Sequence, residues 1–323
     1  MTVHVGVLPT DILDAICAGL DSREEGRFIR LPHPRTGHPC LFMVPKFSPK
    51  TILEIQAVDA TNPRSWFVGE QIVADGRMLM MLPVDPAFLL IPVLRCVLPD
   101  DGSPGTFQPA DDILEEAASK LTSMSQSTKD TPTTLSEDDI LYFSSLDSTK
   151  SAMNRLCDVQ DITPEITVWR YSPTKVVDYL RNKVSALLNA GVLDGSRTLI
   201  RALAKDGLME DGNEKLLEAA RLKLACDLIC QYVPPDVRLT LMKSYESEFK
   251  DLNAYLQKLE DERMMVDKPA TTEKGGKKSS ANGQSTQAVK RKGKAEKAST
   301  GVEKLKKANI NGMAKLSTFF KKT

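Results

Sequence analysis

The stretch RSWFVGEQIVADGRMLMMLPVDPAFLL, residues 64–90, decides the fold of this chain. It opens with two β-prone runs, residues 65–73 and 77–82, which are joined by Ala-Asp-Gly at residues 74–76. An Asp-Gly pair supplies the positive φ angles that a tight turn needs, so we expect a β-hairpin with its turn at these three residues. The stretch therefore predicts β-structure up to residue 82.

A helix is expected directly after the second run. Asp85 is an N-cap residue, and the proline that follows it stands at the first helical position, where a missing N–H costs no hydrogen bond. The surrounding apolar tract, residues 78–98, contains Asp85, Arg95 and three interior prolines, of which Pro92 predicts a kink or a short helix. A membrane-spanning helix would leave these charges unsatisfied, so we interpret the tract as a core strand followed by a core helix and expect no membrane association.

Four more β-prone runs precede this stretch. Each is bounded by Pro, Gly or Asp, which is typical of short strands joined by turns. The runs are residues 3–8, 27–32, 40–45 and 51–58. We assign residues 1–95 to a small β-barrel-like domain, with a short helix as the alternative at residues 14–20. Six short strands leave exposed sheet edges, so this domain is expected to share its sheet with a partner.

Helical patterns dominate the chain beyond the stretch. Helices are expected at residues 110–123, 145–159, 173–191 and 213–233, followed by one or two more within 235–264. A single strand at residues 166–171 interrupts them. We assign residues 96–136 to a helical connection that ends in a polar linker, and residues 137–264 to a helical, winged-helix-like domain. The predicted fold class is therefore α+β.

The carboxyl-terminal residues differ from the rest in charge. Residues 264–323 hold 15 Lys and Arg against 4 Asp and Glu, a net charge of +11. Because the whole chain has 43 residues of each sign, residues 1–263 carry a net charge of −11. Residues 265–323 lack apolar periodicity and cannot offset the entropy of folding, so we expect a disordered tail. An acidic body with a basic tail indicates binding to nucleic acid, acidic partners or import receptors.

Large apolar side chains return at the very end of this tail. In MAKLSTFF, residues 313–320, their spacing places them on one side of a single helical turn. They are Met313, Leu316, Phe319 and Phe320. This pattern resembles the PIP box, the peptide with which proteins bind the sliding clamp, proliferating cell nuclear antigen. That peptide usually begins with Gln, whose hydrogen bonds Met313 cannot make, so we expect binding of micromolar class.

Two alternatives stay open for this segment, namely an amphipathic end that packs on the body and a helix that lies on a lipid surface. Asn311 and Gly312 interrupt the helix upstream, so membrane binding is unfavourable. A second motif in the tail is a candidate nuclear-import segment, with a solvated Lys-rich linker as its alternative. It consists of Lys290, Arg291, Lys292 and Lys294.

The compartment follows from several weak signals. The six cysteines form no Cys-x-x-Cys pair, which indicates reduced thiols in a cytosolic or nuclear protein. The first residues show no basic and apolar regions of a secretory signal. Together with the basic motif, these signals predict a nuclear protein.

Patterns typical of an active site are missing from the sequence. The three histidines lack zinc spacing, and neither a Gly-rich phosphate loop nor a Gly-x-Ser-x-Gly motif is present. Acidic clusters at residues 111–116 and 137–139 stand at expected helix starts, where capping explains them. Cys226 and Cys230, four residues apart on one helix face, are interpreted as core residues. We therefore expect no metal, no cofactor and no catalysis on this chain.

The chain resembles the B subunit of the eukaryotic heterotrimeric type 2 ribonuclease H. Residues 65–67 (Ser-Trp-Phe) and 83–90 (Pro-Val-Asp-Pro-Ala-Phe-Leu-Leu) carry the strongest similarity. Residues 107–109 (Phe-Gln-Pro) and 231–234 (Gln-Tyr-Val-Pro) are further family-like blocks, and the terminal Leu-x-x-Phe-Phe stands where family members carry such a peptide. The resemblance covers most of residues 1–250 in order.

This resemblance implies a role in a complex. The amino-terminal strands would interleave with the C subunit in a shared triple-barrel-like fold, and the catalytic carboxylates, with magnesium, would lie on the A subunit. The assembled enzyme would cut RNA in RNA/DNA hybrids and at single ribonucleotides in DNA. This chain would act as scaffold and recruit the complex to the sliding clamp. A stand-alone winged-helix DNA-binding or clamp-binding adaptor is the alternative function.

Two further groups of residues are candidate sites. The first group is interpreted as core, partner interface or both, because aromatic strand residues serve either purpose. It consists of Trp66, Phe67, Pro83, Asp85 and Phe88. The second group is a candidate nucleic-acid contact, with a packed strand as the favoured alternative. It consists of Trp169, Arg170 and Tyr171.

Overall fold

The structure is a computed structural model that describes residues 3–19, 26–46, 50–62, 64–99, 103–127 and 134–266. All of these residues belong to one compact unit, Met1–Lys268. The disordered tail was predicted from residue 265, but the last helix runs to Val266, so the predicted start is two residues too early. The rest of the tail, with its import segment and its clamp-binding peptide, lies outside the described residues.

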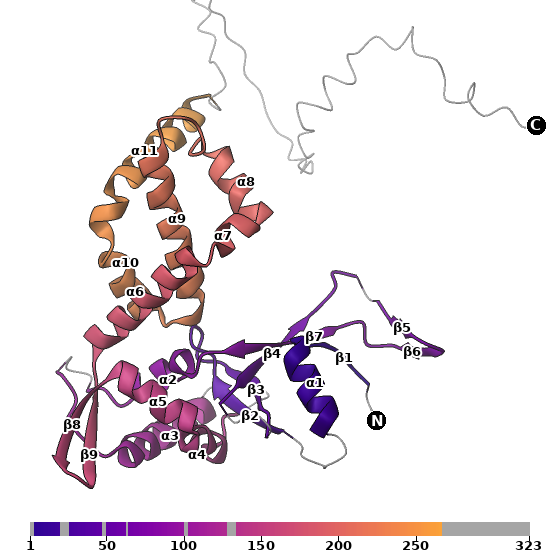
Figure 1. Cartoon of the computed structure of the whole chain (residues 1–323), viewed down its shortest axis with the longest axis vertical. Coiled ribbons are helices and arrows are strands. Elements are labelled where there is room, and N and C mark those ends of the chain that lie inside the picture. Colours follow the sequence, from indigo (N-terminus) through magenta and orange to yellow (C-terminus); the bar gives the residue numbers. More distant parts are fainter. Residues whose placement is uncertain are drawn as a thin grey trace, which may run out of the picture. The chain divides into compact units, whose positions relative to one another are not determined.

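A five-stranded sheet forms the amino-terminal part of the unit (Figure 1). Its strands pair antiparallel except for β1 and β7, which run parallel. Their order across the sheet is β1 (Val5–Val7), β7 (Met78–Val84), β4 (Ile52–Val58), β3 (Pro39–Val44) and β2 (Arg27–Pro32). Five of the six predicted strands are thus confirmed, and β1 is shorter than expected.

Helices cover both faces of this sheet. They are α1 (Thr10–Gly19) and α2 (Pro86–Arg95). Phe42 of β3 belongs to the main core with α2, whereas its neighbour Met43 packs in a small cluster with Ile12 of α1. Successive strand residues point to opposite faces, which explains this division. The alternative of a helix at residues 14–20 is confirmed, although the helix begins at Thr10.

The predicted strand at residues 65–73 is two strands. β5 (Trp66–Val68) and β6 (Gln71–Val73) pair as a hairpin outside the main sheet. Its turn contains Gly69, whose φ of +59° is a conformation that favours glycine. In Figure 1 the hairpin extends from the sheet beyond the ends of β1 and β7. The expected turn at residues 74–76 is therefore wrong.

Gly76 is required for a different reason. A Cβ at this position would lie 2.2 Å from the carbonyl oxygen of Arg64, so only glycine lets the two chain segments cross at the base of the hairpin. Next to it, Asp75 orders residues 75–77, because its Oδ1 accepts hydrogen bonds from the backbone N–H of Arg77 at 3.1 Å and from the Nε of Arg77 at 3.0 Å.

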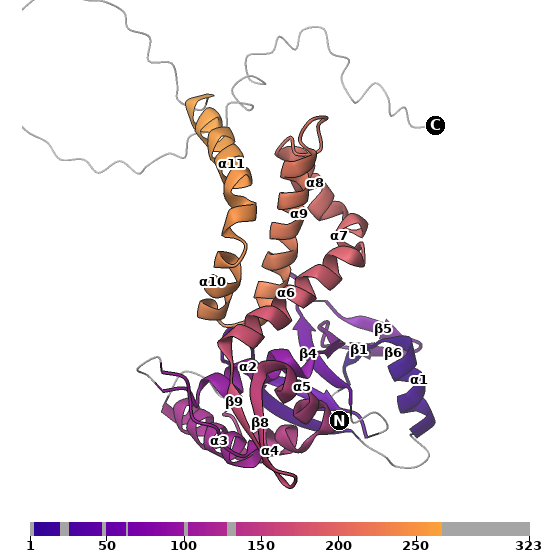
Figure 2. The ribbon, with the colours of Figure 1, turned by 60° about the vertical axis from the view of Figure 1, so that its left-hand side comes forward.

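The segment that follows α2 has the element order of a winged helix. Gln108 forms an isolated antiparallel bridge with Trp169, three helices follow, and a two-stranded hairpin ends the segment. The elements are α3 (Ala110–Ser127), α4 (Glu137–Ser145), α5 (Asp147–Leu156), β8 (Cys157–Thr163) and β9 (Ile166–Tyr171). Leu146 alone separates α4 from α5, as in a tight helix-turn-helix. Figures 1 and 2 both show β8 and β9 beside this group of helices.

Two expectations for this segment need correction. The helix expected at residues 145–159 ends at Leu156, and its last residues begin β8, which sequence reasoning missed. The sequence of β8, CDVQDIT, is too polar for a clear strand signal. Pairing with β9 stabilises it, so its partner rather than its own propensity determines the strand.

The remaining helices are α6 (Pro173–Asn189), α7 (Val192–Gly195), α8 (Arg197–Lys205), α9 (Glu214–Ile229), a 3-10 turn (Cys230–Tyr232), α10 (Pro235–Lys243) and α11 (Glu246–Val266). Of these, α6, α9, α10 and α11 agree with the predicted pattern, whereas α7 and α8 were not predicted. Gly191, with a φ of +64°, follows the end of α6 as predicted. Residues 192–205, for which the sequence offered no interpretation, form α7 and α8. Figure 2 shows α9 and α11 side by side, and Leu208 and Leu252 are buried in one cluster there.

Candidate protein interface

The β5–β6 hairpin carries the largest exposed apolar side chains near the sheet. Phe67 and Ile72 stand directly opposite each other across the two strands, and their exposed fractions are 78% and 68%. Val68, at the turn and on the opposite face of the strand, is 55% exposed. Cross-strand neighbours on one face normally bury each other against a core. Within the described residues nothing covers this pair, so the hairpin presents an apolar face to solvent.

The other face of the hairpin is anchored to the rest of the chain. Trp66 donates a hydrogen bond from Nε1 to the carbonyl oxygen of Arg77 at 3.1 Å, and its cross-strand partner Val73 is 8% exposed. The Trp66 indole is therefore fixed at the base of the hairpin, while Phe67, the next residue, points away. Of the two aromatic residues predicted as core or interface, Trp66 is hydrogen-bonded at the base of the hairpin and Phe67 lies on the exposed face.

The two edges of the main sheet differ. The edge strand β2 is covered, because Asp139 of α4 accepts a hydrogen bond from the backbone N–H of Arg30 at 2.9 Å. Arg27 adds an ion pair to the same carboxylate and lies 4.1 Å from the ring centroid of Tyr142. At the opposite edge, β1 pairs only with β7 among the described residues. An edge strand with free backbone groups is a site where another chain can add a strand.

A further exposed aromatic residue lies on the sheet. Phe28 of β2 is 55% exposed, although its neighbour Ile29 is buried against α2. The cluster around α1 includes residues of β3, β4 and β7 but none of β2. Sequence reasoning did not single out Phe28, Val68 and Ile72, whose exposed apolar side chains make them candidates for an interface. A turn predicted at Gly69 would have paired Phe67 with Ile72 and so identified Ile72 as its neighbour on the same face.

Three of the predicted interface or core residues lie where the sheet meets the helices. Pro83 stands near the end of β7, Asp85 follows that strand, and Phe88 is 8% exposed in the main core. The ring of Phe88 contacts Tyr179 edge-on at 5.8 Å between centroids and Tyr232 at 6.0 Å. Phe88 is therefore core, Asp85 is half-buried among contacts of this chain, and Pro83 is exposed at the end of β7.

Asp85 is the centre of a polar network. It caps α2 as predicted, since its Oδ1 accepts from the backbone N–H of Ala87 at 3.0 Å. Arg155 of α5 and Lys183 of α6 pair with its carboxylate at 3.0 Å and 2.7 Å, and the hydroxyl of Tyr179 donates to it at 2.9 Å. Burial raises the pKa of Asp85, but the hydrogen bonds from Arg155 and Lys183 outweigh it and hold that pKa below its usual range. The network joins β7 to two helices of the carboxyl-terminal half.

A buried carboxylate links the sheet to the 3-10 turn between α9 and α10. Glu54 of β4 is 5% exposed, and its oxygens accept hydrogen bonds from the hydroxyl of Tyr232 and from Nε2 of Gln56, both at 2.9 Å. Burial and the hydrogen bond to Glu54 raise the pKa of Tyr232 to about 12. Burial lowers the pKa of His33, whose Nε2 lies 4.0 Å from the carboxylate. Side chains of this chain therefore satisfy the carboxylate of Glu54.

The candidate nucleic-acid residues are largely engaged with the protein. Tyr171 is 8% exposed in the core. Arg170 pairs with Asp158 at 3.1 Å and stacks over Phe107 at 4.4 Å from the ring centroid. Trp169 donates from Nε1 to Oδ1 of an asparagine on α5 at 3.2 Å and remains partly exposed. The packed-strand alternative therefore describes Arg170 and Tyr171 best.

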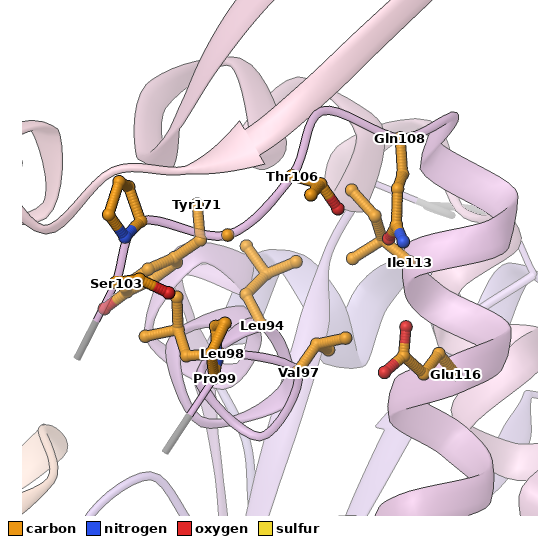
Figure 3. A pocket seen from close by; sticks show the side chains of 12 residues that line it. Leu94, Val97, Leu98, Pro99, Ser103, Thr106, Gln108, Ile113, Glu116 and Tyr171 are labelled. Carbon is orange, nitrogen blue, oxygen red and sulfur yellow. The ribbon is translucent and has the colours of Figure 1, made fainter. Parts of the chain in front are cut away.

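A small pocket opens beside the end of α2 (Figure 3). Its volume is about 220 Å³, and Leu94 and Ile113 supply part of its apolar lining. Gln108 and Glu116 lie on the same side of the pocket as Ile113, across from Leu94 (Figure 3). Glu116 is already paired with Lys120 at 2.8 Å, so the charge at the pocket is compensated.

Neither metal binding nor membrane insertion finds a structural basis in the described part of the chain. No group of three or more His, Cys, Asp or Glu side chains there is arranged to hold a metal ion. None of the helices in the same residues is long and apolar enough to cross a membrane. Cys226 and Cys230 are buried, as predicted, and burial raises the pKa of the Cys230 thiol to about 11.

Comparison with known proteins identifies the family. Residues 88–242 match the model described as the Ydr279p protein family (RNase H2 complex component) wHTH domain, and residues 7–85 match the Ydr279p protein triple barrel domain. The ribonuclease H2 B subunit of Schizosaccharomyces pombe is 24% identical over 299 residues, which are 92% of this chain and 94% of that protein. The ribonuclease H2 B subunit of Xenopus laevis is 34% identical over 91 residues, 28% of each chain. The chain, with its triple barrel domain followed by a winged-helix domain, belongs to the family of ribonuclease H2 B subunits.

Proposed function

We propose that this chain is the non-catalytic scaffold of a heterotrimeric ribonuclease H complex. The complex would cleave RNA in RNA/DNA hybrids and at single ribonucleotides embedded in DNA. Membership of the B subunit family supports the role in a complex. The catalytic carboxylates and their magnesium ions would belong to the A subunit, since the buried Glu54 and the half-buried Asp85 are already bonded to donors of this chain.

The exposed face of the β5–β6 hairpin carries this proposal. A soluble protein that stands alone rarely leaves two large side chains such as Phe67 and Ile72 both more than half exposed on one face. The hairpin lies in the part of the chain that matches the triple barrel domain. We assign this face, together with the free edge of β1 and the exposed Phe28, to the contact with the C subunit.

The tail would supply recruitment and import. Met313, Leu316, Phe319 and Phe320 would bind the sliding clamp, proliferating cell nuclear antigen, and Lys290 to Lys294 would direct the chain to the nucleus. Both assignments rest on the sequence, because these residues lie outside the described part of the chain. Removing residues 313–320 should abolish capture of the clamp while the other two subunits are retained.

The interface assignment is tested by substituting the exposed pair. Phe67→Asp and Ile72→Asp together should reduce the yield of co-purified C subunit by about tenfold or more, since each places a charge in the centre of an apolar contact. Leu239→Asp is the matched control, because Leu239 is 62% exposed on α10, in the carboxyl-terminal half. Unchanged capture of the C subunit by the double variant, or equal loss in the control, would contradict the assignment.

A further inference from the structure

The winged-helix segment has a groove where such domains usually read nucleic acid. In a helix-turn-helix, the second helix enters the major groove and the wing contacts the flanking backbone. Here these elements are α5 and the β8–β9 hairpin. The groove between them has a volume of about 620 Å³. The start of α3 forms its third side, through Pro109 and Asp111.

The charge of this surface does not suit a phosphate backbone. Residues 147–171 contain four acidic and three basic side chains. Two of the basic side chains are engaged: Arg155 pairs with Asp85 at 3.0 Å, and Arg170 pairs with Asp158 at 3.1 Å. Lys150 is the one cation of this segment that has no ion pair among the described residues. Attraction to phosphates supplies most of non-specific duplex binding, so one free lysine is a weak basis for it.

The groove itself combines an apolar floor with two acidic side chains and one basic side chain, Lys150, which lines it from α5. Ile166, which is 49% exposed, and Trp169 line it from β9. Asp111 and Glu165, both exposed, stand at its sides and have no ion pair within the described residues. An exposed apolar surface with a polar rim is typical of a protein-binding site.

Hydrogen bonds hold the two walls in place. Trp169 donates from Nε1 to Oδ1 of Asn154 at 3.2 Å, which ties the indole of β9 to α5. Thr167 donates from Oγ1 to Oδ1 of Asp161 at 2.7 Å, which links the two strands of the wing. The groove is therefore formed before any partner arrives, so binding does not have to order its walls.

We propose that this groove binds a cationic segment of a partner protein that carries a large apolar side chain. The apolar side chain would lie on Ile166 and Trp169, and Lys or Arg groups would approach Asp111 and Glu165. Complementary charge selects a basic segment, and the apolar floor distinguishes that segment from a polyanion. This docking goes beyond assembly of the ribonuclease complex and does not depend on the β5–β6 interface.

The full chain, purified with its partner subunits, is the right material for the test. The probe is a fluorescein-labelled peptide of Lys-Lys-Leu repeats, followed by fluorescence anisotropy. The same peptide with Glu in place of Lys reports on charge, and a labelled DNA duplex reports on nucleic-acid binding. The basic residues beyond 266 are present in every variant, so their contribution to duplex binding is constant.

Three variants should change peptide binding in predictable directions. Asp111→Lys with Glu165→Lys should weaken the peptide by about tenfold or more, because the complementary charge is reversed. Ile166→Ser should weaken it by about fivefold through the loss of apolar contact. Lys150→Glu should tighten the peptide and leave duplex binding unchanged.

A matched control excludes a general charge effect. Glu260→Lys with Glu262→Lys makes the same change in net charge on exposed positions of α11 and should leave the peptide affinity as it is. Equal loss in this control, or unchanged binding in the groove variant with a wild-type thermal unfolding curve, would overturn the proposal. A severalfold loss of duplex affinity in Lys150→Glu would instead identify the groove as a nucleic-acid site and overturn it as well.

Discussion

Two β-hairpins of this chain, β5–β6 and β8–β9, have opposite relations to the core. In β8–β9, Val168 and Tyr171 are 4% and 8% exposed, and Gln108 adds a bridge to Trp169. In β5–β6, Phe67 and Ile72 are mostly exposed, and the hairpin is held at its base alone. The first hairpin completes a domain within the chain, whereas the second leaves an apolar face uncovered.

The difference indicates what each hairpin needs. A two-stranded hairpin is marginally stable in water unless one face is buried. α5 and α6 supply that burial for β8–β9, and the chain pairs its own wing charges, as in Arg170 with Asp158. For β5–β6 the burial has to come from another chain. We therefore expect the β8–β9 hairpin to be stable in the chain by itself, and the β5–β6 hairpin to become stable only when a partner chain covers it.

Substituting one valine in each hairpin tests this comparison. It has the largest expected effect of the changes proposed below. Val168→Asp places an unpaired charge in the core and should lower the local free energy of unfolding of β8–β9 and α5 by about 4 kcal/mol. Val68→Asp, at a position 55% exposed, should leave that value within about 0.5 kcal/mol and reduce capture of the C subunit instead. Native-state hydrogen exchange measures the first quantity and co-purification the second. Similar exchange behaviour in both variants would show that the hairpins are not different.

The Asp85 network, which joins the two halves, should have the next largest effect. Asp85→Asn leaves Arg155 and Lys183 without a counter-charge and should lower the free energy of unfolding by about 3 kcal/mol at neutral pH. Because the folded protein holds the pKa of Asp85 below its ordinary value of about 3.9, this contribution is present above that pH and is lost as the pH falls through the folded pKa.

The pH profile separates this network from a simple loss of capping. Urea unfolding of the two proteins at a series of pH values should show their stabilities converging at acidic pH, while Asn still caps α2. Arg155→Met is the second variant, since it removes one partner and retains the N-cap. A constant difference between Asp85→Asn and wild type across the acidic range would contradict the assignment of the pKa shift.

Most of the fold could be predicted from residue patterns, and the failures share a cause. Asp85 and Gly191 were interpretable because capping and helix termination depend on neighbours in sequence. The strand β8 was not, because β9 stabilises it, and the turn at Gly69 was hidden by the stronger Asp-Gly signal at residues 75–76. Close approach of distant segments, such as Gly76 to Arg64, leaves no local pattern.

The candidate sites were predictable in type rather than in position. Trp66 and Phe67 were both assigned to core or interface, yet only the strand register decides which of them is anchored. Phe28 is exposed because α1 does not reach β2. The length of sheet that α1 covers cannot be read from the residues of β2. For the wing, the acidic composition was visible in the sequence, but the pairing of Arg170 with Asp158 required the structure.

Gly76→Ala should lower stability by an intermediate amount, and only in the sheet and the β5–β6 hairpin. The added Cβ would lie 2.2 Å from the Arg64 carbonyl oxygen, so the crossing has to open, at a cost of about 2 kcal/mol. We expect hydrogen exchange to increase in β5, β6 and the end of β4 and to stay unchanged in β8 and β9. Loss of protection in the winged helix would contradict the separation of the two halves.

Gly69→Ala should have the smallest effect and shows whether the hairpin is formed before the partner binds. An alanine at a φ of +59° costs about 1 kcal/mol, and this position has nothing within 4 Å of the added Cβ. If the partner orders the hairpin, that strain has to be overcome on binding and weakens capture of the C subunit about fivefold. If the hairpin is already formed in the free chain, the strain is present before and after binding, so capture stays unchanged. Gly37→Ala is the control, because its φ of +71° gives similar strain in the turn between β2 and β3. Equal weakening by both variants would mean that capture follows the stability of the whole sheet, whereas a loss confined to Gly69→Ala locates the requirement in the β5–β6 turn.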